Sequence, residues 1–265
     1  MKLNDCPSSG SGVHAFLFYA ACRCVEAGLD DEEAVGLIRA KMTREPSPPT
    51  EIEDALRSAR RDDTVPSQKW PARDINKIVE IKKKPGPTLV APDITQEDAI
   101  DILFPGNPLL CVGASSANFA TKRREEWRGK LKFNSLIVPS PMTATTGKTK
   151  AGHLSAHSLD NTGPRRFIVC EFDWGDWEGQ QKLGFYLARL APLAAVVFSG
   201  GKSYHHWYFC ANDTEDTILH FFKTAVSLGA DKRMWLKSQF ARLPNGTRDS
   251  GVQQKIWYFN PEVIK

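Results

Sequence analysis

A glycine-containing turn between two apolar runs most constrains the fold of this chain. Residues 194–198 are Ala, Val and Phe, residues 199–203 read Ser-Gly-Gly-Lys-Ser, and residues 205–210 are mostly aromatic. Short runs rich in Val and aromatic residues are typical of strands, and a short connection containing glycine is typical of a hairpin. The sequence therefore predicts two neighbouring strands in one sheet.

Helices and further strands flank this hairpin. A strand is predicted over residues 166–173 and a helix over 178–190. A second helix over 214–228 and a last strand over 256–259 follow the hairpin. Strands that alternate with helices around a hairpin favour an α+β fold, an RRM-like core in which a mixed sheet carries helices on one face.

The stretch before this core is less regular. We expect a helix over residues 96–103, strands over 109–113 and 134–138, and a helix or exposed loop over the polar, basic residues 119–130. Residues 143–160 are rich in Gly, Ser, Thr, Lys and His. A long irregular segment of this kind is often functional.

The N-terminal part of the chain has a different character. Apolar residues at helical spacing, Phe16, Tyr19, Ala20 and Cys24 among them, predict the first of three short helices. Five prolines then lie between residues 64 and 92, around a short helix over 72–82. We therefore predict a small all-helical domain (1–63), a linker (64–92) and an α+β domain (93–265).

Composition narrows the class of protein. The formal net charge is +4 and the pI about 8.7, which permits nucleic-acid binding without requiring it. No run approaches the roughly 18 apolar residues that span a bilayer, and the polar start is unlike a signal peptide, so we expect a cytoplasmic protein without a membrane partner. The six cysteines lack zinc-site spacing and are expected to be reduced thiols.

Two carboxylates end the strand over 166–173. Alternating side chains place Glu171 and Asp173 on the same face. Buried without partners they would be costly, and two divalent metal ions would neutralise them. The alternative is a solvent-exposed strand end at which the acids bond Arg165 or Arg166.

The glycine turn suggests a phosphate site. Glycines let backbone amides approach phosphate oxygens, while Lys202 adds a charge and His205 a donor. The spacing is not that of a P-loop, and His205 and His206 face opposite ways, so only one of them should face the acids. A plain tight turn would explain the glycines but neither Lys202 nor His205.

Two later residues complete the candidate set. Asp231 follows the second helix, and Arg242 begins the run Arg-Leu-Pro-Asn-Gly. Taken alone, Asp231 is equally well explained as a helix N-cap, and Arg242 as a surface charge at a turn.

In combination these residues resemble the archaeo-eukaryotic primase superfamily, particularly the primase-polymerases of phages, plasmids and other mobile elements. The resemblance covers residues 165–261. It rests on Glu171-Phe172-Asp173, the Ser203-Tyr204-His205 element within the Ser-Gly-Gly turn, Asp231, and the run that begins at Arg242.

The resemblance implies a template-directed nucleotidyltransferase, a DNA primase and DNA-directed polymerase. Glu171, Asp173 and Asp231 would bind two Mg²⁺ or Mn²⁺ ions, and Ser203 and His205 would hold the phosphates of NTPs or dNTPs on a single-stranded DNA template. Lys202 and Arg242 would add positive charge, and an in-line attack would follow. Glu171 stands where many members carry Asp, and other acids compete with the third position: Asp213, Asp216 and Asp249.

The helical domain resembles the primase C-terminal (PriCT) domain, although here it precedes the core. It would hold the template or initiating nucleotide, dock a replicative helicase, or simply pack on the core. Two alternatives are a catalytically inactive primase-like module that binds nucleotide or single-stranded DNA, and a replication-initiator endonuclease. The endonuclease needs a His-hydrophobe-His motif, which the adjacent His205 and His206 do not provide.

Overall fold

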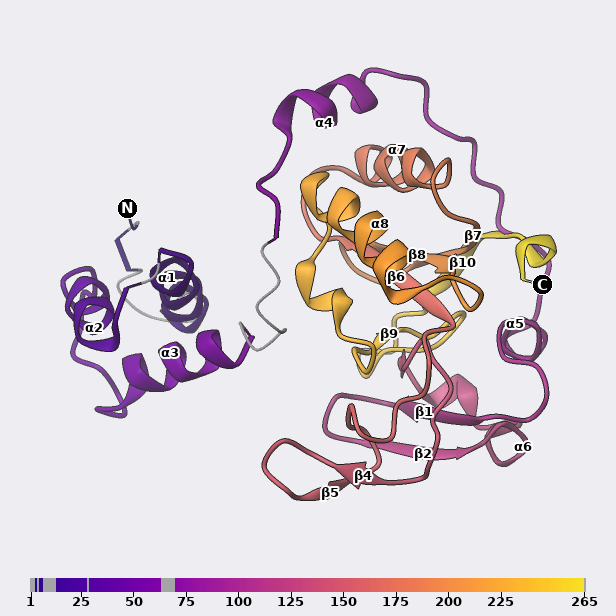
Figure 1. Ribbon diagram of the computed structural model, residues 1–265, viewed down its shortest axis with the longest axis horizontal. Coiled ribbons are helices and arrows are strands. Elements are labelled where there is room, and N and C mark those ends of the chain that lie inside the picture. The colour runs from indigo at the N-terminus through magenta and orange to yellow at the C-terminus, as the bar shows by residue number, and fades with distance from the viewer. Residues whose placement is uncertain (1–2, 4, 7–12, 28, 63–69, 265) are drawn as a thin grey trace. The chain divides into compact units, whose positions relative to one another are not determined.

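The computed structural model describes residues 3, 5–6, 13–27, 29–62 and 70–264. The chain divides into two compact units, Met1–Lys69 and Trp70–Lys265 (Figure 1). Both units have helices, and only the second has strands among the described residues. No helix of the described part is long and apolar enough to cross a bilayer.

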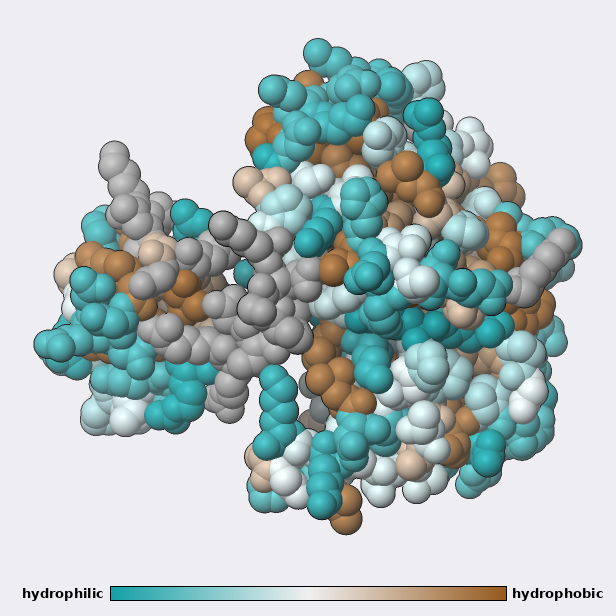
Figure 2. Space-filling view, in the orientation of Figure 1, coloured by the Kyte–Doolittle hydropathy of each residue, from teal (hydrophilic) through white to brown (hydrophobic). Residues whose placement is uncertain are grey.

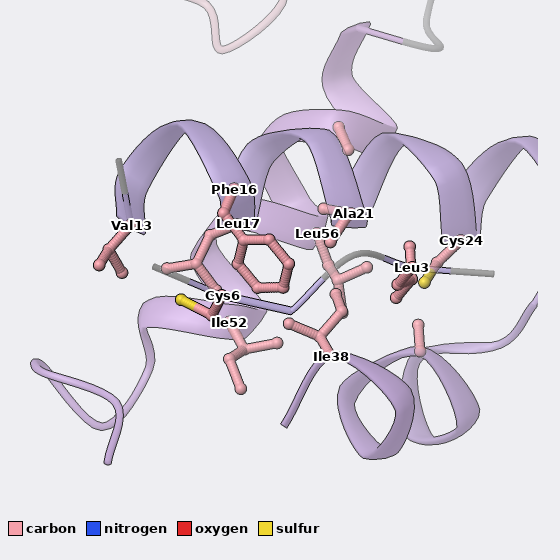
Figure 3. Close-up of a cluster of buried hydrophobic side chains, with 13 residues drawn as sticks. Leu3, Cys6, Val13, Phe16, Leu17, Ala21, Cys24, Ile38, Ile52 and Leu56 are labelled. Atoms are coloured by element: carbon pink, nitrogen blue, oxygen red, sulfur yellow. The ribbon is translucent and has the colours of Figure 1, made fainter. Parts of the chain in front are cut away.

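The first unit contains three helices, α1 (Val13–Glu26), α2 (Asp31–Arg39) and α3 (Glu51–Asp62). Asp30 begins α2 through a capping box, in which its side chain accepts a 2.9 Å hydrogen bond from the Glu33 amide. Tyr19, expected on the apolar face, is instead 53% exposed. Figure 3 shows the shared core, which includes Leu17, Ala21, Cys24, Ile38, Ile52 and Leu56.

The main sheet of the second unit has the order β10-β7-β8-β6. Its strands are β6 (Phe167–Phe172), β7 (Leu193–Phe198), β8 (Tyr204–Phe209) and β10 (Lys255–Phe259). Every neighbouring pair is antiparallel, which corrects the expectation of a mixed sheet. The reason is the β7–β8 hairpin, which inserts β8 between β6 and β7. These two strands run in the same direction, but they are not neighbours and form no parallel pair.

Helices α7 (Trp177–Leu187) and α8 (Glu215–Ser227) lie on one face of this sheet (Figure 1). Tyr208 of β8 points toward them: its hydroxyl donates to the Gly184 carbonyl at 2.7 Å, and its ring meets Phe221 edge-on at 4.9 Å. Phe104, which follows α5 (Gln96–Leu103), meets Phe167 on the other face. The α+β class is therefore observed, with helices on one face.

A second antiparallel sheet has the order β2-β1-β3-β9. Its strands are β1 (Leu109–Gly113), β2 (Phe119–Arg123), β3 (Leu136–Ile137) and β9 (Ala241–Arg242). Residues 119–130 were expected to form a helix or an exposed loop. For the first half of this segment the prediction was wrong, because β2 pairs with β1 there. The short helix α6 (Arg124–Trp127) follows. The unit also contains the single turns η1 (Leu131–Phe133) and η3 (Pro261–Val263).

Residues 70–92, expected as part of a linker, belong to the second unit. They include α4 (Ile75–Lys82), whose Ile78 and Ile81 are buried. The Asp74 amide donates to the Ser227 carbonyl at 2.8 Å, and the Lys182 ammonium to the Lys82 carbonyl at 2.9 Å. The prolines and lysines of this segment do not reveal these contacts in the sequence. The boundary between the two units therefore lies earlier than predicted. Residues 64–69 of the predicted linker lie outside the described residues.

None of the six cysteines, all of them among the described residues, forms a disulfide, and all but the half-buried Cys22 are buried. This agrees with the expectation of reduced thiols.

Candidate functional site

The acid at the end of β6 is held by two residues of the glycine hairpin. The register places Glu171 directly opposite His205, so both side chains share one face of the sheet. The Ser203 hydroxyl donates to Glu171 Oε1 at 2.7 Å, and His205 Nε2 lies 3.4 Å from the same oxygen. The imidazole is 3% exposed and the carboxylate 21%, so this group is largely shielded from water.

Electrostatics keep Glu171 ionised. Burial raises the pKa of its carboxyl group, but His205, Ser203 and Arg242 act against burial and bring that pKa to about 2. The Arg242 backbone N–H points at His205 Nδ1 at 3.5 Å, a weak contact that makes Nδ1 the acceptor.

The adjacent His206 faces the helices instead. It pairs with Cys170 in the register, and burial lowers the pKa of its imidazole to about 3, so the ring is neutral. A methyl group at Gly184 of α7 would lie 2.1 Å from this ring. Of the two histidines, only His205 is on the side of Glu171.

The turn between β7 and β8 is closed by its own serines. The Ser199 amide donates to the Ser203 carbonyl at 2.9 Å, and their two hydroxyl oxygens are 3.1 Å apart. Gly200 has a positive φ of 72°, which favours glycine. At Gly201 a Cβ atom would lie 2.9 Å from the Arg248 guanidinium, which itself donates to the Ser199 carbonyl at 3.4 Å.

Arg248 is a candidate that the sequence reasoning missed. Burial lowers the pKa of the Arg242 guanidinium, and the positive charge of Arg248 lowers it further. The second effect shows that Arg248 lies near Arg242. Among the ion pairs of the described residues, none includes either arginine. Its only sequence signal is its place six residues after Arg242; the turn in which the Arg248 amide donates to the Val252 carbonyl decides where it lies.

Asp173 lies just beyond β6 and is more open. Its side chain is 42% exposed. Its only ion pair among the described residues is with Lys202, whose side chain is 75% exposed and whose ammonium nitrogen is 3.5 Å away. The next residue, Trp174, donates from its indole to the Gly229 carbonyl at 2.8 Å. Its ring also meets the Lys82 ammonium of α4 at 4.8 Å. These contacts tie the loop that carries Asp173 to two other elements.

Asp231 is brought next to the first acid by its backbone. Its amide donates to the Glu171 carbonyl at 2.9 Å. Its carboxylate, however, caps η2 (Lys232–Trp235) and binds the Arg233 guanidinium at 2.6 and 2.9 Å. The N-cap interpretation is therefore observed. The competing acids Asp213, Asp216 and Asp249 are all exposed.

A buried glutamine fixes the hairpin onto α7. Gln180 is 1% exposed; its amide nitrogen donates to the Lys202 carbonyl at 2.9 Å and its oxygen accepts from the Tyr204 amide at 3.1 Å. The end of the glycine turn is thus held in place from the helix side. Sequence reasoning placed this residue only within a helix.

The donor set suits a hard cation in part. Glu171 and Asp173 offer carboxylate oxygens, the ligands that Mg²⁺ and Mn²⁺ prefer. Within the described part of the chain, no three His, Cys, Asp or Glu side chains converge as a ready metal site. The structure therefore brings Glu171, Ser203 and His205 together beside Arg242, while the Asp231 carboxylate is held by Arg233.

No protein-family model and no curated protein matches this chain. Among solved structures, it is similar to the AEP domain of the cyanophage S-2L primase-polymerase (PrimPol). The identity is 16%, the coverage 73% of this chain and 94% of that chain, and the TM-score 0.39. A likeness at this identity and TM-score establishes neither a shared family nor a shared function.

Proposed function

We propose that this protein is a template-directed nucleotidyltransferase, a DNA primase or primase-polymerase that joins NTPs or dNTPs on single-stranded DNA. One observation carries the proposal. An ionised, fixed carboxylate, Glu171, lies beside Arg242, and neither Arg242 nor the neighbouring Arg248 forms an ion pair within the described part of the chain. A metal-bound triphosphate would satisfy both, because the carboxylate suits the cation and the guanidinium groups suit the phosphates.

In this proposal, Glu171 and Asp173 would hold Mg²⁺ or Mn²⁺. The ions would neutralise charge on the phosphates during attack of a 3′-oxygen on the α-phosphorus. Asp231 would join them only after its carboxylate leaves Arg233.

The remaining residues position the substrate. Ser203 and His205 orient the Glu171 carboxylate by the contacts described above. Lys202, Arg242 and Arg248 would bind the triphosphate, and the glycine turn would let it approach the backbone. Such a site acts by positioning and electrostatics, so each contact is expected to matter most in the transition state.

Primer synthesis on unprimed single-stranded DNA, with labelled NTPs or dNTPs and Mg²⁺ or Mn²⁺, tests this proposal. Glu171→Gln and Asp173→Asn should each lower the rate by about 100-fold or more, because each removes a charge that the transition state needs. Asp213→Asn, the same change at an exposed position, is the matched control and should keep full activity. Product that persists undiminished in Glu171→Gln would contradict the proposal.

One observation favours a second function, a module that binds nucleotide or single-stranded DNA without catalysis. The Asp231 carboxylate is engaged by Arg233, so a complete set of three acids is not assembled. Nucleotide binding without product in either a primed or an unprimed assay would support this second function. If Arg233→Met then restored product, the pairing of Asp231 would be the cause.

The role in replication of a phage, plasmid or other mobile element belongs to the same proposal, and it rests on the sequence resemblance alone. A helicase partner and a PriCT-like role for the first unit remain predictions.

A further inference from the structure

A long segment of the second unit has no acidic residue. Between residues 127 and 159 there is no Asp or Glu, whereas five Lys or Arg residues are present: Arg128, Lys130, Lys132, Lys148 and Lys150. Two of the five lie on the hairpin formed by β4 (Gly147–Lys148) and β5 (Leu154–Ser155). In Figure 1 this hairpin projects from the sheet that contains β1 and β2.

The base of the hairpin is rigidly built. Asn161, 1% exposed, donates to the carbonyls of Ala144 and Ala156 at 3.1 Å each, and so joins the two ends of the segment. A Cβ atom at Gly147 would lie 2.7 Å from the Asn161 backbone nitrogen, so this face of β4 is filled. The Thr121 hydroxyl of β2 also donates to the Ala156 carbonyl at 2.6 Å.

The tip, by contrast, is open to solvent. The register places Lys148 opposite Leu154, which is 73% exposed, and Lys150 and His153 are exposed at the turn. Asp160 accepts a hydrogen bond from the Lys148 backbone amide at 2.8 Å. Figure 2 shows a mostly hydrophilic surface over this hairpin. The β4–β5 hairpin, fixed at its base by hydrogen bonds, therefore presents basic groups at its tip.

The foot of the hairpin adjoins the candidate site. The His157 ring stacks on Phe240 at 4.1 Å between centroids, and Phe119 meets both rings. His157 Nε2 also contacts the Ser238 carbonyl. Two residues after Phe240 comes Arg242, whose amide points at His205. A strand of nucleic acid that leaves the site along β9 would thus meet the hairpin.

We propose that the β4–β5 hairpin binds the sugar-phosphate backbone of single-stranded DNA through Lys148 and Lys150. The positive charge of the β4–β5 hairpin is complementary to a polyanion, and lysine ammonium groups bind phosphates as point charges. Lysine contacts with the sugar-phosphate backbone are independent of sequence, and the tip carries no Phe, Tyr or Trp on which bases could stack. That the bound strand is the template rests on the proposed function; that the hairpin binds DNA does not.

The test is fluorescence anisotropy of a labelled single-stranded oligonucleotide with the full chain, without nucleotide, between 50 and 200 mM salt. Lys148→Ala with Lys150→Ala should weaken binding. The slope of log K against log salt is negative, and each lost phosphate contact reduces its magnitude by about 0.7. The magnitude should therefore decrease by about 1.4 in this variant. Lys148→Arg with Lys150→Arg should bind like the wild type.

The matched control is Lys83→Ala with Lys84→Ala. It removes the same charge from exposed positions just after α4, which Figure 1 shows at the opposite end of this unit. A slope unchanged in the hairpin variant, or lowered equally in the control, would overturn the proposal. So would unchanged DNA binding with lost binding to phosphatidylserine vesicles, which would assign the hairpin to a membrane surface. Repeating the titration with Glu171→Gln separates this result from any failure of catalysis.

Discussion

At the scale of the residue, two neighbouring histidines differ because the sheet has two different faces. His205 lies beside an ionised carboxylate, whereas His206 lies against α7 with neither ring nitrogen hydrogen-bonded within the described structure. Burial without a counter-charge keeps His206 neutral, as the lowered pKa of its imidazole, about 3, indicates. The role of His206 is therefore packing, and Gly184 supplies the space that its ring needs.

Gly184→Ala should destabilise the protein by about 2 kcal/mol, although alanine is the better helix former. The reason is that the new methyl group would lie 2.1 Å from the His206 ring. Urea unfolding followed by tryptophan fluorescence measures the loss. The double variant with His206→Ala should show a smaller additional loss than the two single changes predict, and strict additivity would contradict the steric cause.

At the scale of the element, the glycine hairpin is positioned by helix α7 as much as by its own sheet. Gln180 joins the turn to the helix, and Arg248 lies across the turn from the other side. Trp174 likewise ties the loop after β6 to Gly229 and to α4. The candidate site therefore depends on side chains from several elements that carry no functional motif.

Gln180→Met should cost about 1–3 kcal/mol of stability, because the Lys202 carbonyl and the buried Tyr204 amide would lose their partner. Nucleotide affinity should fall with it if the turn binds phosphates. Urea unfolding and a nucleotide titration check the two effects. Gln253→Met, the same change at an exposed residue, is the control and should alter neither. Wild-type stability in Gln180→Met would show that these bonds do not hold the turn.

At the scale of the whole molecule, the boundary between the two units determines which fragment of the chain should fold by itself. The structure places it after Lys69, whereas composition placed the start of the second domain at residue 93. The difference is α4, which covers part of α7 and reaches Trp174.

A chain of residues 70–265 should therefore fold and bind nucleotide like the full protein, provided that the proposed site is correct. A chain of residues 93–265 should melt at a lower temperature, because it lacks the buried Ile78 and Ile81, and because Lys182 and Trp174 would lose their contacts with Lys82. Circular dichroism melting curves of the two fragments provide the comparison. Equal melting temperatures would favour the later boundary.

The sequence by itself determined the elements whose pattern is local. Strand β1, the strands of the glycine hairpin, and helices α7 and α8 all follow from periodicity and turn residues. That Glu171 and Asp173 share one face stays a prediction, because Asp173 lies just beyond the end of β6. The positions of the acid pair, the glycine turn and Arg242 in one region were also expected from motif order. Whether they carry catalysis stays a prediction.

Only the tertiary structure decided the rest, because it depends on contacts between residues far apart in the chain. Strand β2 exists because β1 pairs with it, and β9 is too short to have a periodicity of its own. The antiparallel pairing of the main sheet comes from the insertion of β8. Likewise, no local pattern shows that Arg248 would cover the glycine turn, or that Arg233 would hold the carboxylate of Asp231.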